Sequence, residues 1–189
     1  MRPWIRWIRR GLFVCSVSAL AYCGFVLIDA RIFQRGQQRQ LERLVAAPAE
    51  PVQPTALKSS EGLVGRMEIQ RLGVSAIVVE GTSSATLRRA LGHISGTALP
   101  GEAGNVGISG HRDTFFRPLR NIKANDVITL STPRGEYNYR VLSTRIVDPS
   151  DIAVLDSGET ETLTLVTCYP FYFVGPAPKR FIVRAERVS

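Results

Sequence analysis

The sequence predicts a mainly β domain, built as a barrel or sandwich, preceded by one membrane-spanning helix. Two observations carry this prediction. The first is a series of short apolar or alternating segments separated by Gly, Pro, Asn and Asp. The second is an uncharged run near the N-terminus, over residues 11–28. The 189 residues, of which 44% are hydrophobic and 21% charged, suit one domain of ordinary size and exclude a wholly disordered chain.

The uncharged run over residues 11–28 would reach about 27 Å as an α-helix, barely enough to cross a bilayer. Trp4 and Trp7 precede it among arginines, where amphipathic indoles suit the headgroup layer. A cleaved signal peptide is the alternative. We favour an anchor, because the run exceeds the usual apolar core of a signal peptide and no small-x-small cleavage site follows closely. Residues 1–10 would then form a short basic cytoplasmic tail.

The net charge of +8 has a local origin. Residues 1–47 hold eight arginines against Asp29 and Glu42, whereas residues 48–189 hold 16 basic and 14 acidic side chains. The domain therefore has no concentrated basic stripe, and binding to nucleic acid is not expected. Arginines flank the apolar run equally, so charge does not decide its orientation. A short tail before a long domain favours an extracytoplasmic domain.

The chain between the anchor and the domain, residues 29–62, is expected to form a stalk. Residues 29–45 continue the helix with Arg and Gln, and prolines at 48, 51 and 54 favour an extended backbone after it. The domain over 63–189 contains predicted strands at 65–69, 76–80, 105–109, 126–130, 136–147, 162–167 and 180–187. Helices are predicted at 84–91, with Ser84 as the N-cap, and at 115–121, where Pro118 limits the length.

The domain contains one cysteine, Cys168, because Cys15 and Cys23 lie in the apolar run. A single cysteine cannot form a disulfide within the domain, so it is buried and inert, linked to another chain, or reactive. Only two histidines exist. His111 follows the predicted strand 105–109, and Cys168 follows the strand 162–167; strand ends are where a rigid scaffold presents reactive groups.

Acyl transfer by a thiol also needs a group to protonate the leaving amine and a donor for the oxyanion. Arg180 begins the last predicted strand, twelve residues after Cys168. Antiparallel pairing of the two strands would bring it beside the thiol. A guanidinium stays charged and offers several planar donors, which suits a developing oxyanion.

Three motifs in chain order resemble the sortase family of cysteine transpeptidases. They are Gly-His-Arg-Asp-Thr at 110–114, Thr-Leu-Val-Thr-Cys at 164–168 and Arg-Phe-Ile-Val at 180–183. The segment 149–156 is also similar to the sortase connection between the sixth and seventh strands. The resemblance covers most of residues 63–188 and is nearest to class D. It implies an eight-stranded sortase-type β-barrel with short helices.

The resemblance also implies an activity and its residues. Cys168 would attack the carbonyl of a Leu-Pro-x-Thr-Gly-like sorting signal, cleaving after Thr to give an acyl-enzyme thioester. His111 would protonate the departing amine, and Arg180 would hold the oxyanion or the peptide. Residues expected to form the substrate groove, with Thr167 supporting the nucleophile, are Ser109, Pro149, Ile152, Val154, Leu155, Val166 and Thr167.

The implied partners are secreted proteins with a C-terminal sorting signal and an amine acceptor, either a cell-wall precursor or a pilin lysine. No cofactor is expected: residues 99–105, where some sortases bind calcium, offer only the Glu102 carboxylate. His93 is expected to be structural, and Asp113 either to orient His111 or to cap a short turn at 114–119. Two alternatives remain open: a thiol peptidase that releases the acyl group to water, and an anchored binding module with an inert Cys168.

Overall fold

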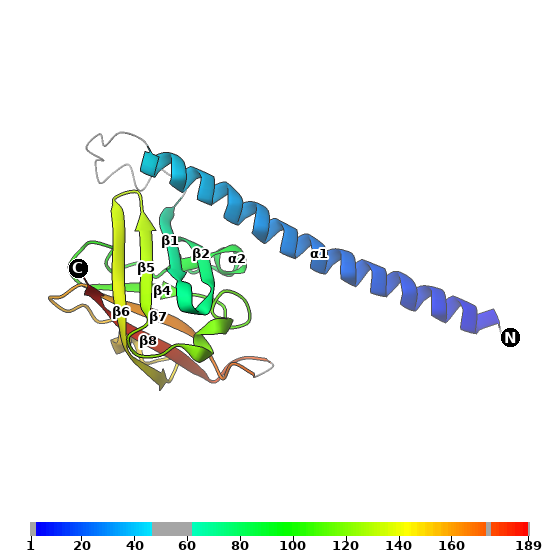
Figure 1. Ribbon diagram of the computed structural model, residues 1–189. Helices are drawn as coiled ribbons and strands as arrows, with labels where there is room; N and C mark the ends of the chain where they lie inside the picture. Colours follow the sequence, from blue (N-terminus) through cyan, green and yellow to red (C-terminus); the bar gives the residue numbers. More distant parts are fainter. Residues whose placement is uncertain (1–2, 47–61, 173–174, 189) are drawn as a thin grey trace.

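The computed structural model describes residues 3–46, 62–172 and 175–188. It contains a long N-terminal helix, α1 (Pro3–Ala46), and a closed barrel of eight strands (Figure 1). The prediction of an eight-stranded, mainly β domain with short helices is confirmed.

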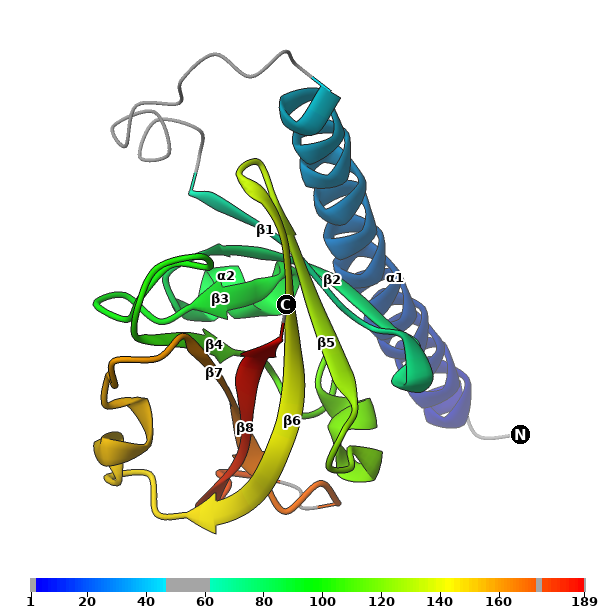
Figure 2. The same ribbon diagram turned by 60° about the vertical axis from the view of Figure 1, so that its left-hand side comes forward.

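The strands follow one another around the barrel in the order β1-β2-β3-β4-β7-β8-β6-β5 (Figure 2). The pairs β2–β3 and β4–β7 are parallel, and the other neighbours are antiparallel. The strands are β1 (Leu63–Ile69), β2 (Val74–Glu80), β3 (Leu91–His93), β4 (Asn105–Ser109), β5 (Val127–Thr132), β6 (Gly135–Val147), β7 (Thr162–Tyr169) and β8 (Lys179–Val188). The helical elements after α1 are η2 (Gln70–Leu72), α2 (Ser84–Arg89), η3 (Arg117–Asn121) and η4 (Ile152–Leu155).

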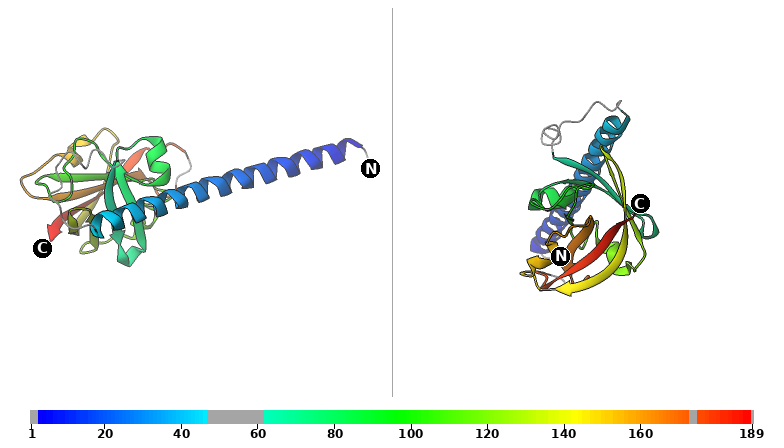
Figure 3. Two further views of the ribbon diagram at one scale, coloured as in Figure 1. Left: turned by 90° about the horizontal axis from the view of Figure 1, so that it is seen from above. Right: turned by 90° about the vertical axis from the view of Figure 1, so that its left-hand side faces the viewer.

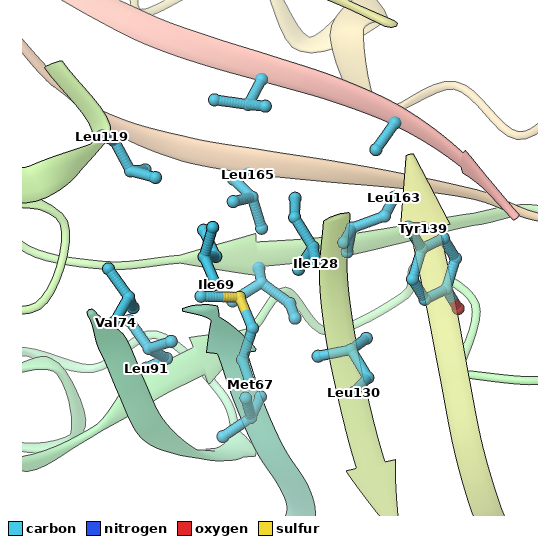
Figure 4. Close-up of a cluster of buried hydrophobic side chains, with 14 of the residues drawn as sticks. Met67, Ile69, Val74, Leu91, Leu119, Ile128, Leu130, Tyr139, Leu163 and Leu165 are labelled. Atoms are coloured by element: carbon cyan, nitrogen blue, oxygen red, sulfur yellow. The ribbon is translucent and has the colours of Figure 1, made fainter. Parts of the chain in front are cut away.

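The barrel interior is filled by every second side chain of the strands, as the pleat of a strand requires. In β1, buried and partly buried residues alternate along the whole strand. Large side chains that meet inside, shown in Figure 4, include Met67, Ile69, Leu91, Ile128, Leu130, Tyr139, Leu163 and Leu165. The Tyr139 hydroxyl donates to Glu161, and burial together with this carboxylate raises the pKa of Tyr139. The tyrosine therefore stays neutral.

The segment predicted as a helix over 84–91 is divided between a shorter helix and a strand. The N-cap is Ser83 instead of Ser84: its hydroxyl accepts from the backbone N–H of Thr86 at 3.1 Å. The helix ends at Arg89, and Leu91 starts β3, where it pairs with Val78 of β2. The short helix α2 thus serves as the crossover that two parallel strands require.

The turn between β1 and β2 is fastened to the start of β5. Arg71 in η2 forms a two-pronged ion pair with Asp126, which is buried, and the backbone N–H of Lys123 also donates to this carboxylate at 2.8 Å. The Arg71 guanidinium holds the pKa of Asp126 below its ordinary value. The same pairing raises the pKa of Arg71.

Helix α1 has an exposed apolar half and a second half that contacts the barrel (Figure 3). Its most apolar window has a mean hydropathy of 2.2, enough to cross a membrane, although a signal sequence would pass the same test. Leu41 is 5% exposed and clusters with Leu63, Ile77 and Val79, with Phe33 packed against this cluster. Residues 29–41 therefore belong to the domain, where a stalk was expected. The proline-containing part, 47–61, lies outside the described residues.

Candidate active site

Three neighbouring strands, β4, β7 and β8, present one continuous outer face. Val106 and Ile108 of β4, Leu163 and Leu165 of β7, and Val183 and Ala185 of β8 belong to the buried core. Because side chains alternate along a strand, Val166 and Cys168 of β7 lie on the opposite, outer face. The same alternation places Ile182 and Arg180 of β8 there. The outer face of these strands therefore carries two of the three predicted catalytic residues.

Cys168 and Arg180 are direct partners in the antiparallel register of β7 and β8. Both residues are half-buried. The Arg180 guanidinium donates through one nitrogen to the carbonyls of Ala177 and Lys179, at 3.3 and 3.1 Å. A guanidinium has five N–H donors, so others remain for a ligand at the thiol.

His111 lies at the end of β4, on the other side of Cys168 from Arg180. In the parallel register of β4 and β7, Ser109 pairs with Val166, and His111 and Cys168 each follow two residues later. Two residues is one full period of a strand, so His111, two residues past the end of β4, lies at about the same level as Cys168 inside β7. The His111 side chain is exposed. The three predicted catalytic residues thus come from adjacent strands at one end of the barrel.

Hydrogen bonds on both sides of His111 connect its loop to the strand of Cys168. The Gly110 N–H donates to the Val166 carbonyl at 3.2 Å, and the Thr167 hydroxyl donates to the Gly110 carbonyl at 2.8 Å. On the far side, the Arg112 guanidinium donates to the Pro170 carbonyl at 2.8 Å. The neighbours of His111 are therefore bonded to the neighbours of Cys168.

Two residues in this connection depend on tight packing. A Cβ at Gly110 would lie 2.6 Å from the Leu91 side chain and 2.7 Å from the Phe116 ring, so only glycine allows this approach. Arg112 is only 6% exposed and pairs with Asp113 at 3.2 Å. Within the described residues, Asp113 pairs with Arg112 and makes no hydrogen bond to His111. No hydrogen bond among the described residues therefore supports the expected alternative in which Asp113 orients the imidazole.

Three aromatic rings pack against one another where β7 ends and β8 begins: Tyr169, Phe171 and Phe181. Phe171 lies 5.2 Å from Phe181 and 6.1 Å from Tyr169, measured between ring centroids. Lys179 beside Arg180 is paired with Asp148 at 2.7 Å. These contacts fix the backbone at the start of β8, where Arg180 is attached.

One wall of the site is the connection from β6 to β7, which contains η4. The Val154 carbonyl accepts from the side chains of Asn105, Thr164 and Arg184, at 3.2, 3.4 and 3.4 Å. These residues belong to β4, β7 and β8, so η4 is fastened across the outer face. A hollow of about 410 Å³ lies beside it, lined by Val154, Ile182, Asp151, Arg145 and Arg184, among others.

The structure brings some of the predicted groove residues together and leaves others apart. Ser109 and Val166 are paired in register, and Val154 and Leu155 of η4 are half-buried. Pro149 is exposed and Ile152 is 75% exposed, so neither is packed into a wall. Thr167 is 3% exposed and bonded to Gly110. Its place is in the support of the site, and it offers no surface to a peptide.

A hollow of about 440 Å³ lies at the other end of the barrel and includes His93, Leu63, Leu99 and Arg134 in its lining. His93 is buried, with Nδ1 at 2.6 Å from the Glu80 carboxylate and Nε2 at 2.9 Å from the Ala98 carbonyl. Both ring nitrogens are thus occupied, in agreement with a structural role. The Glu102 carboxylate accepts from the Leu99 N–H and from Arg134.

Comparisons with known proteins agree with one another. A family model described as the sortase domain matches residues 67–188. The chain belongs to the sortase family. Sortase D of Bacillus subtilis (strain 168) is 33% identical over 195 aligned residues, which cover 94% of this chain and 97% of the relative. This relative accords with the class D resemblance of the motifs.

Solved sortase structures show the same barrel. The Sortase D5 transpeptidase of Clostridium perfringens superposes with a TM-score of 0.74 at 25% identity, covering 83% of this chain and 99% of that chain. Sortase C1 of Streptococcus agalactiae shares the fold, with a TM-score of 0.69 at 23% identity over 82% of this chain and 98% of that chain. Sortases are cysteine transpeptidases associated with the cell envelope, and the exposed apolar half of α1 is compatible with an anchor.

The sequence of this sortase did not reveal that Arg112 bonds to the Pro170 carbonyl, or that Thr167 bonds to the Gly110 carbonyl. Arg112 stands inside the quoted motif, yet no local pattern distinguishes a buried arginine from an exposed one. Its role depends on Pro170, 58 residues away along the chain. Only the pairing of β4 with β7 brings the two segments together.

Proposed function

We propose that this sortase cleaves a Leu-Pro-x-Thr-Gly-like sorting signal after Thr and transfers the new carboxyl terminus to an amine. The single observation that carries the proposal is the register of β4, β7 and β8. It makes Cys168 the direct partner of Arg180 and the neighbour of the His111 loop. This register supports a shared site for a nucleophile, an acid–base group and a fixed cation.

The proposed reaction has two steps. In the first, the Cys168 thiol gives its proton to His111 and the sulfur bonds to the Thr carbonyl carbon. His111 passes this proton to the departing glycine amine as the C–N bond breaks. Arg180 donates to the carbonyl oxygen, on which negative charge develops. In the second, the acceptor amine attacks the thioester and loses a proton to His111. The new C–N bond forms as the C–S bond breaks, and His111 returns the proton to the sulfur, which regenerates the thiol.

The proposed partners are secreted proteins that end in a sorting signal, together with an amine of a cell-wall precursor or of a pilin lysine. We place the catalytic domain outside the cytoplasm, with α1 as a single-pass anchor and residues 1–10 inside. The apolar run over 11–28, none of which is buried in the structure, supports the anchor. A protease added to intact cells would digest the barrel if this orientation is right.

The test of the activity is a cleavage assay on a Leu-Pro-x-Thr-Gly peptide with triglycine or a diamine as acceptor, followed by mass spectrometry. We expect the amide-linked product with the unchanged protein and with Cys23→Ser, the matched control in α1. Cys168→Ala should form no product. A product that is only the free acid at high amine concentration would indicate a thiol peptidase. A Cys168 that reacts with methanethiosulfonate no faster than free cysteine would favour a binding module.

A further inference from the structure

The direction of α1 relative to the barrel is fixed by polar contacts immediately after the apolar run. The Arg89 guanidinium donates to Asp29 at 2.6 Å and lies over the Phe33 ring. Gln34 bridges two elements: its amide nitrogen donates to the Arg89 carbonyl at 2.6 Å, and its oxygen accepts from the Ile77 N–H at 2.9 Å. Helix α1 is thus held against both α2 and β2 from Asp29 onward.

No spacer separates the apolar run from these contacts. The run ends at residue 28, and Asp29 is already bonded to the domain. Because α1 is one continuous helix from Pro3 to Ala46, a rotation of the barrel about the membrane segment would need either a break in the helix or the loss of this contact. The orientation of α1 in a bilayer therefore sets the orientation of the barrel.

The apolar half of α1 leaves the barrel on the side of the candidate active site. Leu91, two residues after Arg89, packs against Gly110 in the His111 loop, whereas Leu41 clusters with Leu63 near the other end. In Figures 1 and 3, α2 and the β7–β8 connection lie on the side toward the N-terminus of α1. The β5–β6 turn lies on the opposite side.

The side of the domain toward the apolar run also carries exposed positive charge. Arg31 and Arg35 on α1 and Arg88 on α2 are all exposed. Tyr172, in the β7–β8 connection, is 86% exposed. Arginine binds phosphate through a planar fork of donors, and tyrosine suits the boundary between lipid and water. These side chains are therefore typical of a surface that touches lipid headgroups. A domain held far from the membrane would have no need of them there.

We propose that α1 holds the barrel directly against an anionic lipid bilayer, with α2 and the Cys168 end of the barrel turned toward the headgroups. The proposal rests on the membrane anchor of the proposed function. Its consequence for substrate choice is that the cleaved peptide bond must reach Cys168 close to the membrane surface. A sorting signal held near the bilayer by its own chain meets this condition.

Depth-dependent fluorescence quenching tests the orientation. The full chain, carrying Cys15→Ser, Cys23→Ser and Cys168→Ala, receives one labelled cysteine by Arg88→Cys, Tyr172→Cys or, on the far side, Arg134→Cys. The labelled proteins are reconstituted in phosphatidylcholine and phosphatidylglycerol vesicles that contain headgroup spin-labelled lipid. We expect loss of fluorescence from the first two labels and little loss from the third. Equal quenching at all three sites, or stronger quenching from Arg134→Cys, would overturn the proposal.

An insertion into helix α1 provides a second test of the proposed contact between the barrel and the membrane. Seven residues inserted after position 28 add about 10 Å and nearly two full turns, so the barrel moves away with little rotation. We expect the quenching at Arg88→Cys and Tyr172→Cys to fall; unchanged quenching would contradict direct contact.

The same insertion in the otherwise natural chain should leave cleavage of a soluble peptide in detergent unchanged. Failure of that cleavage in the natural chain itself would instead refute the proposed function, and failure to float with vesicles would refute the anchor.

Discussion

At the scale of single residues, the site depends on two side chains that touch no predicted substrate. Thr167 and Arg112 bond to Gly110 and Pro170, so the positions of His111 and Cys168 are set by the residues on either side of them. Both are almost fully buried. Small displacements at reacting groups cost large factors in rate, because the bound geometry must match the transition state closely.

Replacing Thr167 by valine should therefore affect catalysis more than stability alone explains. Thr167→Val keeps the shape but leaves the Gly110 carbonyl without its donor, which costs about 1–3 kcal/mol of unfolding free energy. We expect kcat to fall by up to about 10²-fold. The matched control is Thr132→Val, a buried threonine of β5 whose hydroxyl donates to the Gly135 carbonyl at 3.1 Å. Equal kcat losses in both variants, measured beside urea denaturation, would show only a general effect of destabilisation.

Replacing Arg180 by alanine tests its proposed place at the oxyanion. Arg180→Ala should fold normally and lower turnover by roughly 10²–10³-fold. Arg180→Lys should recover only part of this, since an ammonium lacks the planar fork. Arg140→Ala, an exposed arginine on β6, serves as the control. Turnover near that of the unchanged protein in Arg180→Ala would remove the residue from the mechanism.

At the scale of elements, the ion pair between Arg71 and Asp126 joins the β1–β2 turn to the start of β5. The pKa of Asp126 lies below its ordinary value of 3.8 in the folded protein, chiefly because of the Arg71 hydrogen bond. Since the folded state holds the carboxylate in its charged form, the stabilisation is complete above about pH 4 and is lost as the pH falls through the lowered pKa.

We therefore expect Asp126→Asn to be less stable than the unchanged protein at neutral pH, because the asparagine gives Arg71 no charged partner. The difference should shrink as the pH falls below about 4, where the unchanged protein loses the same interaction. Urea denaturation at a series of pH values measures both effects. A difference that is independent of pH would mean that the ion pair contributes nothing through its charge.

The elements also show where sequence patterns succeed and where they stop. The alternation in β1 and the apolar run of β7 are local, and both were predicted nearly in full. The three residues of β3 are too few to alternate, and their strand conformation depends on β2 and β4. Phe33 and Leu41 stand eight residues apart on one helical face, and this spacing was the available sign that residues 29–41 pack against the domain.

At the scale of the whole molecule, the sequence shows the order of His111, Cys168 and Arg180 along the chain. It does not show how near these three residues are to one another in the fold. The pairing of Cys168 with Arg180 could be foreseen, because a hairpin joins neighbouring strands. The neighbourhood of His111 and Cys168 requires the parallel pairing of β4 with β7, across more than fifty residues, which no local pattern specifies. The contacts of Arg112 and the direction of α1 depend on the closed barrel in the same way.

The place of β8 in the barrel has a consequence for how the protein folds. His111 leaves the ribosome before Cys168, and Cys168 before Arg180. Since β8 joins β7 to β6 and closes the barrel, a nascent chain has no assembled catalytic centre until β8 has been made. A chain that is cut before Lys179 should therefore carry a thiol with no guanidinium opposite it and a barrel that stays open.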